Sequence, residues 1–357
     1  MDKKLLKTLT TLLLLGTTLA AQAIDRKALS EYASSLKGQK KADLKTAVFN
    51  LIGNLKTLSY GSGYRKTWWG FYRTDRIGNT MECRNRYSDV KFYFTGDDGK
   101  SIAGMNIEHS FPKSWWGKTK NNAYQDLHHL YPSDAKANSS KSNYPMGIVT
   151  SGSSAPDGAE KVGMGPGPNG QLIKMFEPAD QFKGDFSRTY MYMATAYQNL
   201  TWQGTQGLQE LENNSWPTLR QWAYTIYTEW IKNDPVSDIE IERNNAVAEI
   251  QGNRNLFIDY PYLAEYIWGD SINYEFDPAK TVTTKVEMGD ESRMCIYLTN
   301  FKTSDGGCTI ETPLYPKEGV EVWELTKSYG WKGTGAMKEG TNTYATKFAA
   351  ESSVVTP

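Results

Sequence analysis

Apolar side chains recur every three or four positions in several segments of this chain, a spacing typical of helices with one buried face. In one such segment Leu44, Val48 and Leu51 share a face, and Asp43 is the expected N-cap. The same reasoning applied along the chain predicts helices over residues 26–37, 42–54, 186–199, 218–233 and 238–250.

A different pattern follows residue 270, where short apolar runs alternate with turns of Gly, Asp and Ser. The strand-like runs are residues 281–288, 295–301, 309–310 and 320–325. Upstream, we expect a strand at residues 90–95 and a long surface loop at residues 150–172, which are rich in Gly, Pro, Ser and Asn. The predicted fold class is α+β, with a mainly helical domain at residues 24–272. A small all-β domain follows at residues 280–357, and its last residues read like the opening of further strands.

Residues 1–23 have the pattern of a secretory signal peptide. Three lysines precede an apolar run at residues 9–20, and Ala21-Gln-Ala23 has the form of a cleavage site. A membrane anchor is the alternative, but the run is shorter than the about 20 residues that a span needs. We therefore expect cleavage after Ala23, no membrane span in the remainder, and a secreted or periplasmic protein.

Overall charge argues against a protein that coats itself in nucleic acid. The sequence holds 40 basic and 40 acidic residues, and the part that follows Ala23 has a net charge of −2. Nucleic-acid binding would therefore require a local basic surface. Residues 64–91 and 100–141 each carry more Lys and Arg than Asp and Glu, whereas residues 275–357 are acidic.

The three cysteines cannot all pair within one chain. Cys295 and Cys308 flank a turn, so a hairpin disulfide between them is one prediction and two free thiols are the other. Cys83 is left over in either case. None of the three has the CxxC spacing of a zinc site.

All three histidines of the sequence, His109, His128 and His129, fall within one stretch of 21 residues. We predict a strand ending at Glu108-His109, a loop at residues 113–125, a strand at residues 127–131, and a helix capped by Ser133 that carries Asn138. Neighbouring side chains on a strand face opposite ways, so at most one of His128 and His129 can point towards His109.

Phosphodiester hydrolysis would suit these residue types. A neutral imidazole is a competent base near neutral pH, and a carboxylate with an amide carbonyl suits a hard cation such as Mg²⁺. Zinc hydrolysis would require HExxH or three convergent histidines, and a serine triad would normally show GxSxG; neither pattern is present. Histidines packed in a core for structural reasons are the remaining alternative.

Several motifs in this part of the chain resemble those of a known family. Asn106-Ile-Glu-His-Ser-Phe-Pro-Lys-Ser-Trp115, Asp126-Leu-His-His-Leu-Tyr-Pro-Ser-Asp134 and Asn138-Ser-Ser-Lys-Ser-Asn-Tyr-Pro-Met-Gly147 resemble the bacterial endonuclease I family, extracellular and periplasmic nucleases with a ββα-metal (His-Me finger) site. Gln251-Gly-Asn-Arg-Asn255 and Glu265-Tyr-Ile-Trp-Gly269 continue the resemblance, which covers roughly residues 40–270.

The resemblance implies a role for each matching residue. His109 would be the general base, and Glu108 and Asn138 would hold one Mg²⁺ ion, replaceable by Mn²⁺ or Ca²⁺. Lys141 stands where the family usually has arginine and would contact phosphate, while Leu256 replaces a common proline. His128 would lie near the site, and His129 would serve packing. Phosphate binding or a structural salt bridge are equal alternatives for three arginines: Arg188, Arg243 and Arg254.

The resulting functional prediction is a secreted, sequence-nonspecific, Mg²⁺-dependent endonuclease that cleaves DNA and, as a second substrate, RNA. Backbone contacts rather than base contacts would account for the lack of sequence preference. The alternative is a non-catalytic exported protein whose 11 Trp and 22 Tyr bind nucleic acid or glycan by stacking.

Overall fold

The computed structural model describes residues 24, 26–154 and 160–284, together with the backbone of four later strands at residues 293–298, 300–304, 307–311 and 321–326. The predicted signal peptide lies outside the described residues. So do the side chains of Cys295 and Cys308 and most of the predicted all-β domain. Cys83, which is described, is buried and free.

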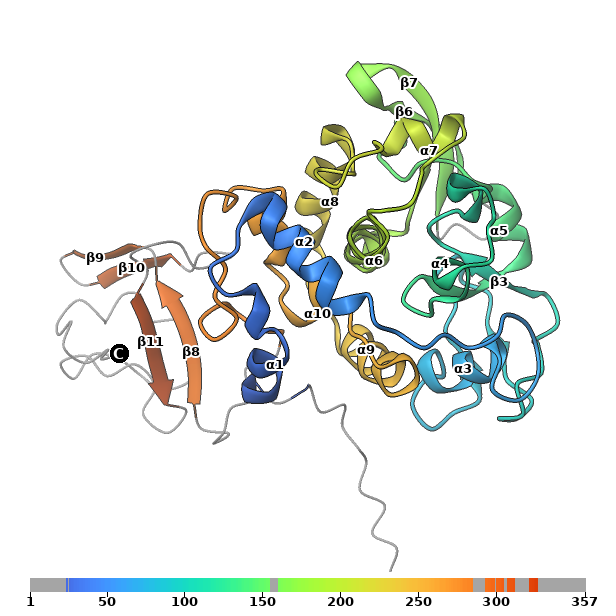
Figure 1. Cartoon of the computed structure of the whole chain (residues 1–357), viewed down its shortest axis with the longest axis horizontal. Helices are drawn as coiled ribbons and strands as arrows, with labels where there is room; N and C mark the ends of the chain where they lie inside the picture. Colours follow the sequence, from blue (N-terminus) through green and yellow to red (C-terminus); the bar gives the residue numbers. More distant parts are fainter. Residues whose placement is uncertain are drawn as a thin grey trace, which may run out of the picture.

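Helices are the main regular structure of the described region (Figure 1). The α-helices are α1 (Arg26–Tyr32), α2 (Lys41–Ile52), α3 (Thr67–Thr74), α4 (Asn122–Gln125), α5 (Ala135–Lys141), α6 (Lys183–Ala196), α7 (Thr205–Glu210), α8 (Gln221–Asn233), α9 (Asp238–Gln251), α10 (Leu256–Asp259) and α11 (Leu263–Ile267). The 3₁₀ turns are η1 (Ser34–Leu36), η2 (Lys113–Trp116), η3 (Pro168–Gly170) and η4 (Asp180–Phe182).

The strands form small antiparallel sheets. They are β1 (Glu82–Cys83) with β2 (Phe92–Tyr93), β3 (Met105–His109) with β4 (Leu130–Asp134), and β5 (Ser151–Ser154), β6 (Lys161–Pro166) and β7 (Leu172–Glu177) in that order. Beyond residue 292, β8 (Arg293–Leu298) pairs with β11 (Glu321–Thr326), and β9 (Asn300–Ser304) pairs with β10 (Gly307–Glu311).

Helix α6 forms the centre of the main hydrophobic core. Every residue of this helix except Lys183 is buried, as expected for a helix surrounded by other elements rather than lying on the surface. Helices α2, α8 and α10 pack against it. Figure 1 shows α6 nearly end-on, between α2 and the part of the chain that holds β3, α4 and α5.

A smaller core lies beneath α3 and α9. It joins Trp68 and Phe71 of α3 to Leu127, Leu130 and Val247. Helix α9 has clear end signals: Ser237 and Glu240 form a capping box, and Gly252 ends the helix with a φ of 83°. Together the two cores enclose the β3–β4 pair, which supports the candidate site.

Helix predictions agree with the structure better than strand and loop predictions. Helices α2, α6, α8 and α9 lie where helical spacing placed them. The N-cap of α2 is Lys40 without a side-chain hydrogen bond, so the prediction of Asp43 was wrong. The strand expected at residues 90–95 shortens to β2.

The predicted loop at residues 150–172 was also wrong, since residues 151–154 and 161–166 belong to the β5–β6–β7 sheet. Glycines concealed the strand pattern there. A Cβ on Gly165 would collide with the Ile148 carbonyl, so glycine at this position allows a close backbone approach and does not mark a loop.

Within the described ranges, none of the helices combines the length and apolar character that a bilayer crossing requires.

Candidate active site

Strands β3 and β4 followed by α5 form a compact ββα unit. Glu108 pairs with Tyr131 and His109 pairs with Leu130. The second strand therefore begins at Leu130, three residues later than predicted, and His128 and His129 lie in the turn before it. The predicted cap was wrong as well: Asp134, not Ser133, caps α5 by accepting hydrogen bonds from the backbone N–H groups of Lys136 and Ala137.

Helix α6 fixes the ββα unit from behind. The Tyr190 hydroxyl donates to the Ser110 carbonyl at 2.6 Å, one residue after His109. Thr189 and Tyr131 share a hydrogen bond between their hydroxyls at 2.7 Å. Because a buried hydroxyl loses water as a partner, these bonds favour one position of the strands against the helix.

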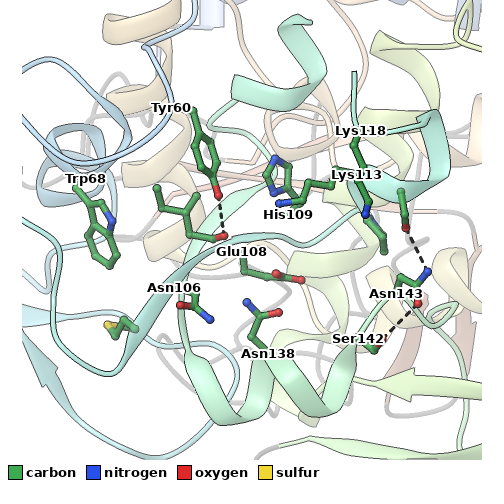
Figure 2. Close-up of a pocket in the computed structure, with 14 residues that line it drawn as sticks. Tyr60, Trp68, Asn106, Glu108, His109, Lys113, Lys118, Asn138, Ser142 and Asn143 are labelled. Carbon is green, nitrogen blue, oxygen red and sulfur yellow. Dashed lines mark hydrogen bonds between the residues drawn. The ribbon is translucent and has the colours of Figure 1, made fainter. Parts of the chain in front are cut away.

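Glu108, His109 and Asn138 all line one cavity of about 570 Å³ (Figure 2). Glu108 and His109 are adjacent on a strand, where side chains normally alternate between faces, yet both border this cavity because they lie at the strand end. Asn138 reaches it from the first turns of α5. The structure therefore brings together the three residues that the sequence placed in one site.

The His109 ring is enclosed by aromatic side chains. Tyr60 stacks on it with ring centroids 5.5 Å apart, and Tyr124 lies 4.7 Å away. His109 Nε2 lies 3.0 Å from the Tyr124 carbonyl oxygen. A carbonyl can only accept, so Nε2 carries the hydrogen and Nδ1 is left with a free lone pair. Burial, with His129 and Lys113 nearby, lowers the pKa of His109, so the ring is neutral at physiological pH and can accept a proton.

Glu108 is held by Lys141, whose Nζ donates to Oε1 at 2.9 Å. Lys141 is fully buried, so the structure gives it a carboxylate partner rather than the open position that a phosphate contact would need. Burial raises the pKa of Glu108, an effect that Lys141 and Lys113 oppose. A carboxylate has about four acceptor positions, so one bond from Lys141 leaves room for a further ligand.

The residues around the cavity fit a hard cation. Glu108 supplies a carboxylate, and no hydrogen bond within the described part of the chain engages the Asn138 side-chain amide. Among the described residues, no group of three or more His, Cys, Asp or Glu side chains could hold a metal ion. An ion held here would therefore use few protein ligands and keep several waters, which suits Mg²⁺.

The structure supports one of the two expectations for the histidines of the turn. His129 is fully buried, as expected for a packing residue, and it lies beside His109 with ring centroids 5.5 Å apart. Its Nε2 donates to the Ala123 carbonyl. His128, expected near the site, does not line the cavity, and its ring packs on Tyr192 at 4.6 Å.

The three arginines considered for phosphate binding lie in buried ion pairs. Arg188 makes two hydrogen bonds of 2.6 Å to Glu240. Arg243 binds Asp75 and the Leu130 carbonyl, and Arg254 binds Asp259. None of the three lines the cavity with His109, so the geometry favours the salt-bridge alternative for each.

Sequence reasoning missed several residues that line the cavity. Lys113 and Lys118 provide its cationic end, and Asn143, Asn106, Tyr60 and Trp68 complete much of its wall. In Figure 2 the two lysines lie on one side of His109, and Trp68 lies on the other. Lys113 stands four positions after His109 in the quoted motif and was a possible signal. Nothing local could have linked Tyr60 or Trp68 to the site.

Comparison with known proteins identifies the family of this chain. The family model described as Endonuclease I matches residues 40–262. An extracellular ribonuclease of Bacillus subtilis (strain 168) is 30% identical over 263 residues, which cover 70% of this chain and 83% of the relative. An extracellular ribonuclease of Bacillus amyloliquefaciens is 31% identical over 249 residues, which cover 66% and 78% respectively. The chain belongs to the endonuclease I family and is a nuclease that hydrolyses phosphodiester bonds.

Proposed function

We propose that this nuclease is an extracellular, sequence-nonspecific and Mg²⁺-dependent endonuclease that cleaves both RNA and DNA. The observation that carries the proposal is the position of His109, with its proton-accepting Nδ1 free, in one cavity with Glu108 and Asn138. Membership of the family sets aside the non-catalytic alternative. The predicted signal peptide and the extracellular relatives support secretion.

In this proposal His109 Nδ1 removes a proton from the attacking water, while the Tyr124 carbonyl holds the ring in the required tautomer. Tyr60 and Tyr124 fix the plane of the ring. The lone pair is then directed by neighbouring groups before substrate binds, so little reorganisation is needed during the reaction.

Glu108 and the Asn138 carbonyl would hold the metal ion, with Lys141 orienting the Glu108 carboxylate. When bound, such an ion supplies charge neutralisation at the scissile phosphate and a water acidic enough to protonate the leaving oxygen. The Asp134 cap and its hydrogen bond from Ser88 orient α5, and thereby Asn138, towards β3.

Lys113 and Lys118 would contact substrate phosphates in place of Lys141, because they line the cavity while Lys141 is buried. Phosphate contacts carry no base information, which accounts for the proposed lack of sequence preference. A water nucleophile does not require the ribose 2′-hydroxyl, so the same site can act on RNA and DNA. The ribonuclease names of the two relatives support RNA as a substrate.

A cleavage assay with plasmid DNA and total RNA tests the proposal. Both substrates should be degraded with Mg²⁺ and protected by EDTA. His109→Ala should reduce the rate by at least about 100-fold, the usual effect of losing a general base. Full activity of this variant would remove His109 from the mechanism.

Metal binding can be measured separately, by calorimetric titration with Mn²⁺ in the absence of substrate. Asn138→Ala should weaken binding and raise the Mg²⁺ requirement for cleavage. Ser139→Ala is the matched control, since Ser139 is the next residue of α5 and its exposed hydroxyl bonds only locally, to the Ala135 carbonyl. An unchanged metal titration for Asn138→Ala would exclude Asn138 as a ligand.

A further inference from the structure

An exposed group of aromatic and cationic side chains lies in and just before α3, the helix that also contributes Trp68 to the cavity wall. We call it the α3 stacking surface and define it by Tyr64, Arg65, Lys66, Trp69 and Arg73. Tyr64 is 73% exposed, Arg65, Lys66 and Arg73 are also exposed, and Trp69 is half-buried. None of these residues has a part in the proposed catalytic machinery.

The side chains of this surface are stacked on one another. The Arg73 guanidinium lies 3.5 Å from the centroid of the Trp69 ring, and its Nη1 donates to the Trp69 carbonyl at 3.0 Å. Tyr64 meets Trp69 edge-on, with ring centroids 5.9 Å apart. These contacts occupy one face of the guanidinium, and both Arg73 and Tyr64 remain exposed.

The loop that presents Tyr64 is anchored to the protein. Gly63 donates its N–H to the Gly99 carbonyl at 2.8 Å, and a Cβ on Gly99 would collide with the Gly63 backbone. Gly99 has a φ of 83°, which also favours glycine. The exposed tyrosine is therefore held in place, which reduces the conformational entropy that a ligand stacking on it would have to remove.

Trp68 links this surface to the cavity. It precedes Trp69 in α3 and lines the cavity on the side away from Lys113 and Lys118 (Figure 2). A strand whose phosphate lies at Glu108 and His109 has the two lysines on one flank and Trp68, the neighbour of Trp69 in α3, on the other. Asp97 is an acidic neighbour of Arg73, but Arg65 and Lys66 add positive charge beside it.

We propose that the α3 stacking surface binds unpaired bases of the substrate strand beside the scissile phosphate, so that the enzyme binds single-stranded nucleic acid more tightly than duplex. Bases stack readily on tyrosine rings and on guanidinium planes. In a duplex the bases stack on each other instead, so the exposed ring and guanidinium could contact only the backbone. This inference rests on the proposed function, because it takes the cavity as the site of cleavage.

Binding is measured by fluorescence anisotropy with the His109→Ala protein, which keeps substrate intact, and with labelled single-stranded and duplex oligonucleotides of equal length. In this background Tyr64→Ala should weaken single-strand binding about tenfold, the effect of losing one base stack. Tyr64→Phe keeps the aromatic ring and should bind the single strand as tightly as the parent does. Tyr274→Ala, an exposed tyrosine of the segment after α11, is the matched control and should leave both affinities unchanged.

Substitutions of Arg73 distinguish a contribution of its charge from a contribution of stacking on its guanidinium plane. Arg73→Lys keeps the positive charge but loses the planar guanidinium, so it should weaken single-strand binding, although less than Arg73→Ala, which loses both. If lysine preserves the affinity, Arg73 contributes charge alone and the stacking proposal is wrong. Equal losses for single strand and duplex on Tyr64→Ala would overturn it too, since they would indicate a backbone contact.

The binding assay is independent of the catalytic proposal. If the parent enzyme showed no Mg²⁺-dependent cleavage, the proposed function would fail, whereas Tyr64→Ala would still report on base stacking. Conversely, normal cleavage with no single-strand preference would leave the proposed function intact and refute this inference. Because Tyr64 is 73% exposed, its replacement should not affect folding, and thermal unfolding of the variant provides the check.

Discussion

Arg243→Ala should destabilise the protein strongly without weakening its binding to nucleic acid. Arg243 is buried, and its Nε and Nη2 bind the two Asp75 oxygens at 3.0 and 3.3 Å. Nη2 also donates to the Leu130 carbonyl at 2.7 Å, which ties α9 to β4. Asp75 is fully buried and accepts from Arg86 at 2.9 Å as well.

Removing one partner of a buried ion pair typically lowers the free energy of unfolding by about 3–5 kcal/mol, because the other charge is left uncompensated. Asp75 would retain Arg86, so we expect the lower end, about 3 kcal/mol. With a urea dependence of about 2 kcal/mol per molar, the unfolding midpoint should fall by about 1.5 M.

Burial raises the pKa of Asp75, but Arg243 and Arg86 outweigh this and lower it overall. The stability from Asp75 is therefore complete above pH 3.8 and is lost as pH falls through the lower folded pKa.

The assay is urea unfolding followed by tryptophan fluorescence, with oligonucleotide anisotropy measured on the same samples. Arg220→Ala is the control, since that arginine is partly exposed and its 3.3 Å pair with Glu212 should contribute only about 0–1 kcal/mol. An unchanged midpoint for Arg243→Ala, together with weaker and less salt-dependent binding, would refute the structural role and restore Arg243 as a phosphate contact.

Two further stability predictions can be measured by the same urea unfolding. Burial raises the pKa of Glu160 to about 9, with Lys141 opposing the shift, so the stability of the parent falls as pH rises from about 4.5 towards 9. Glu160→Gln replaces the buried carboxyl with an amide that does not ionise. It should stabilise the protein by about 3 kcal/mol at pH 7 but not at pH 4. Equal effects at both pH values would contradict the reasoning. Ser237→Ala breaks the capping box of α9 and should lower stability by about 1 kcal/mol, and no change would show that the cap contributes nothing.

Local pattern was sufficient for the parts of this protein that depend on near neighbours in the chain. Helix α8 follows from the spacing of its apolar residues and α9 from its end signals, because both kinds of contact join residues three or four positions apart. The order of strand, connecting segment, strand and helix was predicted correctly, although η2 and α4 lie within the predicted loop and β4 begins three residues late. The motif residues also placed Glu108, His109 and Asn138 together, and they do line one cavity.

Tertiary structure decided what each polar side chain contacts. Lys141 binds Glu108 across 33 positions, and Arg243 binds Asp75 across 168, so neither partnership leaves a local signal. For the same reason the sequence could not tell which histidine adjoins His109, or that Lys113 and Lys118 rather than the arginines face the cavity. In the sequence, a charged side chain looks the same whether it binds substrate or a buried partner. Only packing distinguishes the two roles, because it buries one charged group away from water and leaves the other exposed in the cavity.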